Sequence, residues 1–157
     1  MTKDPRTMYH VAAQFLMAAH RCIRKEPFGG RPAESLDVPG IVNVAFAAEV
    51  LFKGLLSMEG LLPERAGHLL ANLFEQLPER HRAHIRDRVE QEFDQFDERL
   101  RSVSDCFREW RYVYEVESLT LHNNRFLHKL THTTADHLLA SLRIDPKDQV
   151  TLVRPVP

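Results

Sequence analysis

PGIVNVAFAAEVLFKGLLSMEG at residues 39–60, followed by LLPERAGHLLANLFEQLP at residues 61–78, is the stretch that decides the fold. Its first part predicts one long helix, apolar on nearly all sides and interrupted by a single Glu and a single Lys. Such a helix belongs in the middle of a bundle, because other elements must cover its apolar surface. Gly60 and Pro63 end it. The second part predicts a short amphipathic helix that Pro78 stops, with an inward face of Leu69, Leu70, Leu73 and Leu77.

A first helix is predicted upstream of this stretch. It begins at Asp4-Pro5, because Asp is a favourable N-cap and Pro suits the first helical position. Pro27 and the glycines that follow it place the helix end near Lys25, and residues 26–37 are predicted to form a surface loop. Its apolar face repeats at helical spacing through Ala12, Phe15, Leu16, Ala19 and Ile23.

The second half of the chain has neither Pro nor Gly from residue 79 to residue 145, which predicts helices separated only by polar turns. A single helix along its apolar stripe would be about 50 Å long, so we expect two helices, the second capped by Asp94 with Asp97 in its first turn. The last helix is expected to be capped by Asn123 or Asn124 and to turn Leu127, Leu130, Leu138 and Leu142 inward. The stripe alternates spacings of four and three through Val89, Phe93, Phe96, Leu100, Val103, Phe107, Trp110 and Tyr114.

Composition places the chain among single-domain, all-α proteins, with a helical domain over residues 4–144 and an extended tail over residues 145–157. The 21 basic and 22 acidic residues nearly balance, so no net field draws the protein to nucleic acid or an anionic membrane. Cys22 and Cys106 match no metal-ligand spacing and are expected to be free thiols in a reducing compartment. No signal peptide or membrane span is apparent. We therefore expect a cytoplasmic protein without cofactor or membrane partner.

Glu49 and Lys53 form an i, i+4 pair in the favoured order on the most apolar helix. Buried charges must be paired and hydrogen-bonded, because each desolvated ion costs several kcal/mol. Two interpretations stay open: a structural ion pair that fixes the helix register, or part of a ligand site. Asn43, on the same helix, has the same two interpretations.

The segment FREWRYVYE, residues 107–115, mixes aromatic and arginine side chains. This mixture suits a nucleotide or single-stranded RNA, through stacking on bases and pairing with phosphate. Trp110 lies on the core stripe, and the same mixture also suits a helix that docks on a bundle. Arg111 and Tyr112 lie off the stripe and are the better functional candidates, with Arg108 beside them.

Histidines concentrate late in the chain. His128, His132 and Asp136 follow at successive i, i+4 steps and are compatible either with metal ligation or with a solvated polar face. His81 and His84 lie within a run of arginines, which is expected to be solvated, although it is also the one patch suited to a phosphate backbone. No glycine-rich phosphate loop, nucleophile elbow or Cys-x-x-Cys motif is present.

Three segments together resemble the HEPN domain, a small helical domain named for nucleotide binding in higher eukaryotes and prokaryotes. They are NVAFAAEVLFKGLL from Asn43, GHLLANLF from Gly67 and including His68, and FREWRYVYE from Phe107, and the resemblance covers about residues 8–142. It implies an up-and-down bundle of four to five helices, commonly a homodimer, often with a cognate partner protein in toxin–antitoxin, defence or RNA-processing systems. It also implies a nucleotide or RNA ligand, for which the candidate residues are Asn43, Glu49, Lys53, His68, Arg108, Arg111 and Tyr112.

Active HEPN proteins resemble metal-independent ribonucleases that use an Arg and, four to six residues later, a His. The usual position after Arg111 lacks the His. Arg125 and His132 do have the spacing, with six residues between them, and would serve as phosphate-stabilising cation and as general base. The sequence thus predicts a non-catalytic or weakly active binding module, with an RNA endonuclease as the alternative.

Overall fold

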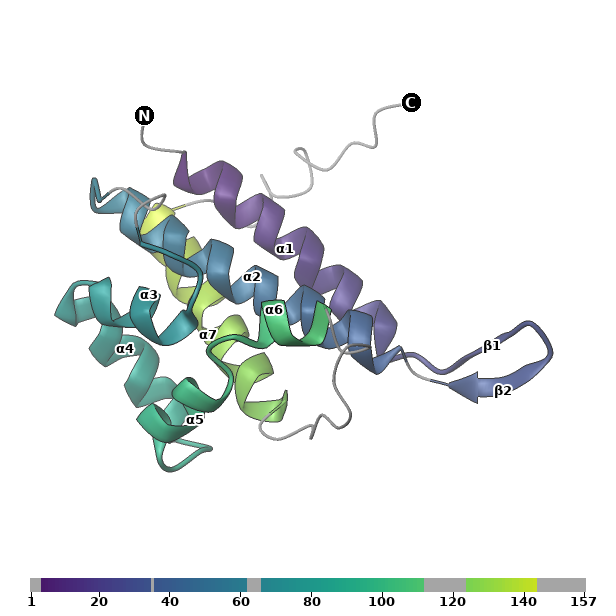
Figure 1. Cartoon of the computed structure of the whole chain (residues 1–157). Coiled ribbons are helices and arrows are strands. Elements are labelled where there is room, and N and C mark those ends of the chain that lie inside the picture. Colours follow the sequence, from purple (N-terminus) through teal and green to yellow (C-terminus); the bar gives the residue numbers. More distant parts are fainter. Residues whose placement is uncertain (1–3, 35, 62–65, 112–123, 144–157) are drawn as a thin grey trace.

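Helices form almost all of the regular structure in the computed structural model, which describes residues 4–34, 36–61, 66–111 and 124–143 (Figure 1). The predicted all-α class is therefore confirmed, with one short hairpin added. In chain order the elements are α1 (Pro5–Cys22), β1 (Glu26–Phe28), β2 (Arg31–Glu34), α2 (Asp37–Met58), α3 (Leu70–Gln76), α4 (Glu79–Glu90), α5 (Phe96–Ser102), α6 (Cys106–Arg111) and α7 (Asn124–Leu142).

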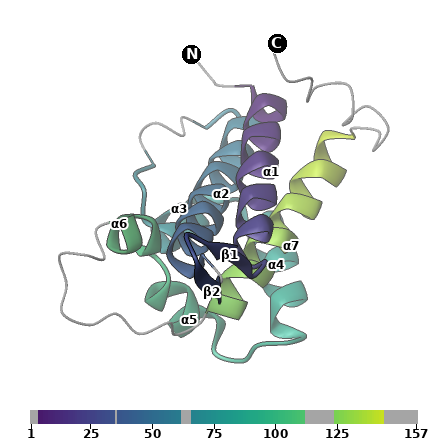
Figure 2. The ribbon, with the colours of Figure 1, turned by 90° about the vertical axis from the view of Figure 1, so that its right-hand side faces the viewer.

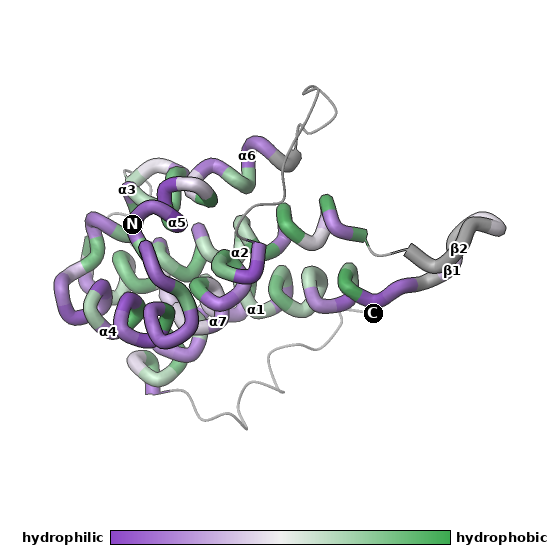
Figure 3. The backbone as a smooth tube through the Cα atoms, turned by 90° about the horizontal axis from the view of Figure 1, so that it is seen from below, coloured by the Kyte–Doolittle hydropathy of each residue, from purple (hydrophilic) through white to green (hydrophobic). Residues whose placement is uncertain are grey.

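Helix α2 is the central element, as its composition predicts. It packs against α1, α3, α6 and α7, and in Figure 3 it is mostly hydrophobic whereas α4 is mostly hydrophilic. By length and composition α2 is the one described helix that could cross a membrane, yet 67% of its most apolar window is buried inside the fold. The apolar residues that repeat at helical spacing along one face of α2 are all buried: Ile41, Val44, Ala45, Ala48, Phe52, Leu55 and Leu56.

Helix α1 begins where the sequence predicts. The Asp4 carboxylate accepts hydrogen bonds from the backbone N–H groups of Arg6 and Thr7, at 3.1 and 3.3 Å, and thereby satisfies two donors that have no helical partner. The helix ends at Cys22, three residues before the expected Lys25, and Ile23 is 56% exposed rather than part of the inward face. The prediction for this end was wrong because the chain already turns into the hairpin there.

The hairpin replaces the surface loop expected over residues 26–37. Strands β1 and β2 are antiparallel, with Glu26 opposite Glu34 and Phe28 opposite Arg31. Gly29 and Gly30 form the turn with φ of 57° and 78°, a left-handed conformation that glycine adopts without strain. The two glycines therefore do more than end the helix, as the sequence predicts: they also close a hairpin. It projects from the helical body at the α1–α2 end (Figure 1) and lies in front of the helices in Figure 2.

The segment after Pro78 forms three helices, α4, α5 and α6, instead of the two expected before the last helix. Gln95, with φ of 54°, precedes α5, so Asp94 is not its N-cap. Asp94 instead accepts a 2.9 Å hydrogen bond from the Arg99 guanidinium. The apolar stripe survives both breaks, because each helix turns the same side toward one core. Val89, Phe96, Leu100 and Val103 are buried, and Phe93 and Phe107 pack partly buried against them.

The last described helix, α7, begins at Asn124, and its predicted cap stays a prediction because the residue before it is not described. Leu127, Leu130 and Leu138 are buried as expected, and Leu142 is partly buried. In α3 the inward face is likewise confirmed for Leu70, Leu73 and Leu77, but Leu69 is 39% exposed because it precedes the helix. Asn123 and the tail over residues 145–157 lie outside the described residues.

Candidate functional site

The buried carboxylate of Glu49 organises the first candidate site. Its side chain is 5% exposed, and its Oε1 accepts both the Lys53 ammonium and the His68 ring N–H, each at 2.8 Å. Glu49 Oε2 is buried without a hydrogen-bond partner among the residues that the structure describes. The ion pair predicted from the i, i+4 spacing therefore exists, and His68 extends it to the surface.

A pocket of about 640 Å³ opens beside this network, between the start of α3 and the start of α6. The turn before α6 is held to α3 by two hydrogen bonds: Leu70 N–H to the Ser104 carbonyl, at 3.0 Å, and Ala71 N–H to Ser104 Oγ, at 2.9 Å. The pocket combines apolar walls with groups that can bind charge, and its lining residues are His68, Leu69, Leu70, Ser104, Asp105, Phe107 and Arg108. Two of the predicted ligand-binding residues, His68 and Arg108, thus share one pocket.

The other predicted ligand-binding residues are placed less fully. Asn43 is partly buried on α2, one turn or more before Glu49. The Arg111 side chain and Tyr112 lie outside the part of the molecule that the structure describes. The predicted grouping of Glu49 and Lys53 with Arg111 and Tyr112 is therefore untested, whereas the contact of Glu49 with His68 comes from the tertiary structure.

Arg125 and His132, the predicted catalytic pair, line one groove of about 490 Å³ along the first half of α7. Asn124, His128 and Lys129 contribute further polar groups to this groove. Burial lowers the pKa of His128, and the neighbouring His132 adds to the effect. The helix thus places the two residues on one side, as their spacing requires.

Metal ligation at His128, His132 and Asp136 finds no support. Among the described residues, no group of three or more His, Cys, Asp and Glu side chains is placed to hold a metal ion. The His128 and His132 rings instead lie nearly parallel, with centroids 6.5 Å apart.

Thiol chemistry is also disfavoured. Cys22 and Cys106 are both free, as the sequence predicts. Burial raises the pKa of the Cys106 thiol to about 12, and nearby carboxylates add to this. The thiolate is the reactive form, so Cys106 serves as a small core residue.

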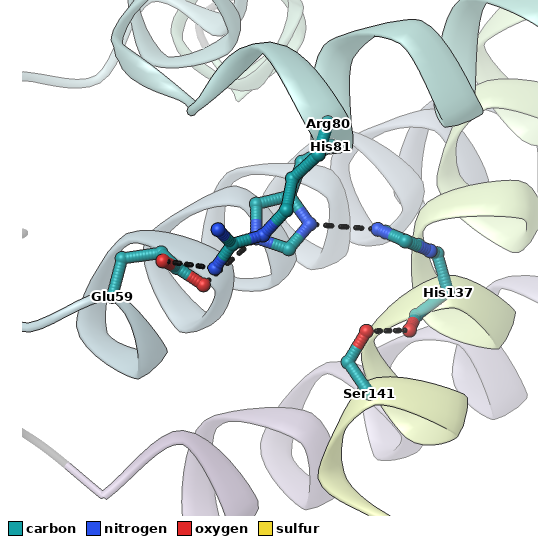
Figure 4. A network of polar contacts seen from close by, with 5 residues as sticks. All are labelled: Glu59, Arg80, His81, His137 and Ser141. Atoms are coloured by element: carbon teal, nitrogen blue, oxygen red, sulfur yellow. Dashed lines mark hydrogen bonds and ion pairs between the residues drawn. The ribbon is translucent and has the colours of Figure 1, made fainter.

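A second polar cluster, which we call the histidine network, was missed by sequence reasoning (Figure 4). His81 is buried, 3% exposed, and joins three helices: its Nε2 lies 3.0 Å from Glu59 Oε1 at the end of α2, and its Nδ1 lies 2.7 Å from His137 Nε2 on α7. Arg80 also binds Glu59, and the exposed His84 stacks on His137 with ring centroids 4.2 Å apart.

The expected solvated face was therefore wrong for His81. One signal in the sequence could have found it: His81, Ile85 and Val89 follow at spacings of four, so the imidazole shares the inward face of α4. Only the fold supplies its partners, because Glu59 and His137 are distant in sequence. All three of these α4 side chains are buried.

The electrostatics of the histidine network follow from its geometry. The hydrogen bond from His81 lowers the pKa of Glu59, with help from Arg80, so this carboxylate is ionised. Burial lowers the pKa of His137 to about 4, and the imidazoles of His84 and His81 add to the effect. At neutral pH the ring of His81 thus joins an ionised Glu59 to a neutral His137.

Comparison with known proteins identifies no relative from which the role of these sites could be inferred. A scan against protein-family models found no match, and neither did searches of curated proteins and of solved structures. Membership of the HEPN family stays a hypothesis based on the residues quoted above.

Proposed function

We propose that the protein is a non-catalytic, HEPN-like module that binds a nucleotide in the pocket between α3 and α6. The observation that carries this proposal is the meeting of His68 and Arg108 in one pocket, backed by the buried Glu49–Lys53 pair. His68 and Arg108 are far apart in the sequence, so only the fold brings them together. A cytoplasmic location and a role beside a cognate partner protein, in a toxin–antitoxin or defence setting, belong to the same hypothesis.

The pocket chemistry matches the two halves of a nucleotide. Leu69, Leu70 and Phe107 offer apolar surface for a base, and an aromatic face adds stacking energy of about 1–3 kcal/mol per base. Arg108 can bind phosphate through its planar guanidinium, and in the structure it pairs with Asp105. Because the Glu49 carboxylate in its ion pair with Lys53 accepts hydrogen bonds, we place the His68 proton on Nδ1, which leaves the other ring nitrogen to a ligand.

Nucleotide binding is tested by calorimetry with AMP, ATP and short RNA oligonucleotides. Phe107→Ala and Arg108→Ala are each expected to weaken binding about tenfold or more, since each removes an interaction of roughly 1.4 kcal/mol or more. Arg6→Ala, at the exposed start of α1, is the matched control and is expected to bind normally. Wild-type protein that binds none of these ligands at millimolar concentration would contradict the proposal and leave a partner protein as the occupant of the pocket.

RNA cleavage is the second candidate function, favoured by the placement of Arg125 and His132 in one groove. In this mechanism His132 removes the proton of a ribose 2′-hydroxyl and Arg125 stabilises charge on the phosphate. Either Arg125→Ala or His132→Ala is expected to lower the cleavage rate at least a hundredfold, with chelator having no effect. Cleavage that survives both substitutions would exclude this pair.

A homodimer completes the proposed module. It is supported by large apolar side chains that the described part of the chain leaves 39–58% exposed: Met17, Ile23, Leu36, Leu61 and Leu69. Where such side chains gather in one patch, that patch favours association. Light scattering is expected to give twice the 18.2 kDa mass of the chain. A protein that stays monomeric up to about 1 mM, roughly the highest dissociation constant of a specific weak dimer, would rule the dimer out.

A further inference from the structure

The histidine network has one end at the surface, in a polar groove that is separate from the proposed nucleotide pocket. This groove, of about 430 Å³, lies between α4 and α7, and its main polar lining residues are His84, Arg88, Lys129, Thr133, Asp136 and His137. Arg88 and Lys129 come from opposite walls and bring positive charge, and Thr133 brings a hydroxyl donor. We propose that this groove binds a tetrahedral oxyanion, the phosphate of a phosphate monoester, and takes up one proton as it does so.

The proton positions in the network follow from its ends. The ionised Glu59 can only accept, so His81 carries a proton on Nε2. In the arrangement that we propose, His81 Nδ1 accepts a hydrogen bond from His137 Nε2–H across 2.7 Å. This leaves the lone pair of a neutral His137 on Nδ1, and His137 lines the groove.

An anion in the groove reverses the balance that keeps His137 neutral. Burial and two neighbouring imidazoles disfavour its charged form, and a dianion beside it favours that form. One proton taken from solvent by His137 Nδ1 makes that nitrogen a donor to the anion. The Nε2 proton can then shift across the hydrogen bond to His81 Nδ1, so that the positive charge lies beside the Glu59 carboxylate, 3.0 Å away.

Other charges around His137 set the strength of this coupling, and the Asp136 carboxylate in the groove opposes the anion. The groove has Arg88 and Lys129 against Asp136, and Lys129 also pairs with Glu92. Four elements around the network supply titratable or charged neighbours: Glu59 at the end of α2, Arg80, His81, His84 and Arg88 on α4, Lys129 and Asp136 on α7, and Tyr9 on α1. Burial raises the pKa of Tyr9, and the charge of Asp136 adds to the effect. Because an anion meets both cations at once, the groove favours a doubly charged ligand.

Sulfate is the first probe, because it stays a dianion across the pH range of the experiment. Calorimetry is expected to show saturable binding that tightens as pH falls from about 8 to about 6, approaching tenfold per pH unit for one coupled proton. The His137 ring nitrogens should move toward imidazolium chemical shifts on addition of sulfate. Absence of saturable binding at the acidic end, or equal affinity at both ends of the range, would overturn the proposal.

Variants separate the groove from the network behind it. Arg88→Ala is expected to weaken sulfate binding about tenfold at every pH, as for the loss of one charged hydrogen bond. Glu59→Gln, which keeps the shape of the side chain, is expected to retain binding near pH 8 but to lose most of its tightening with acid. Arg101→Ala, on the exposed side of α5, is the matched control. Arg108→Ala changes the proposed nucleotide pocket instead of this groove. It should leave sulfate binding unchanged, even if the protein binds no nucleotide. A Glu59→Gln protein with unchanged pH dependence would exclude the relay.

A second arm identifies the source of the phosphate. Phenyl phosphate and inorganic phosphate are compared at one pH near 8, where both are mainly dianions. Tighter binding of the ester supports a phosphate monoester as the ligand class, whereas equal binding overturns that assignment in favour of free phosphate.

Discussion

Phe96→Ala is expected to lower the free energy of unfolding by about 4 kcal/mol, within the range for large-to-small changes of a buried phenylalanine. Phe96 is 1% exposed and contacts the rings of Phe74 and Phe126, with centroids 5.1 and 5.7 Å apart. The Arg86 guanidinium lies 4.6 Å from the ring centroid. The substitution therefore removes transfer energy, two aromatic contacts and a cation–π contact together.

The position of Phe96 explains why so short a helix as α5 depends on it. The ring belongs to an aromatic chain that links α2 through Phe52, α3 through Phe74 and α7 through Phe126. Chemical denaturation measures the loss, with Phe96→Leu as a volume-preserving comparison expected to cost less than about 1.5 kcal/mol. The half-buried Phe93 is the positional control, and Phe93→Ala should cost roughly half as much as Phe96→Ala. Equal losses of unfolding free energy at both positions would show that the core is not centred on this row of aromatic rings.

Lys53→Met is expected to destabilise the protein by about 3 kcal/mol, because it leaves the buried Glu49 carboxylate without its cation. The remaining partner, His68, has a side chain that is 78% exposed, so it is hydrated and compensates the buried charge poorly. Removing both charges should reverse the loss. The free energy of unfolding of the double variant Glu49→Leu, Lys53→Met is expected to lie within about 1 kcal/mol of the wild-type value, because apolar residues often replace a buried ion pair without loss of stability.

The double variant also decides between the two interpretations of this ion pair. If the pair positions His68 for a ligand, the double variant should fold normally but bind nucleotide about tenfold more weakly. Normal binding together with normal stability would assign the pair a structural role only. Denaturation and calorimetry on the same four proteins, wild type, two single variants and the double variant, complete the cycle.

The hairpin and the histidine network show where pattern reasoning has limits. Gly29-Gly30 correctly predict that the first helix has ended before them. A local signal for a turn does not say, however, whether strands pair on either side of it. His81 shares a spacing of four with buried residues, yet its arginine neighbours Arg80 and Arg82 suggested a solvated face. In both cases the deciding contact lies between segments whose relative position the sequence does not state.

By itself the sequence determined the all-α class, the central place of α2, the start of α1 at Asp4 and the Glu49–Lys53 pair. These features depend on periodicity, capping and i, i+4 spacing, which are local and therefore readable from neighbouring residues. Only the tertiary structure decided that His68 completes the Glu49 cluster beside a pocket, and that Glu59, His81 and His137 meet. Such contacts join residues on different helices, and their distances depend on how the whole core packs rather than on any one segment.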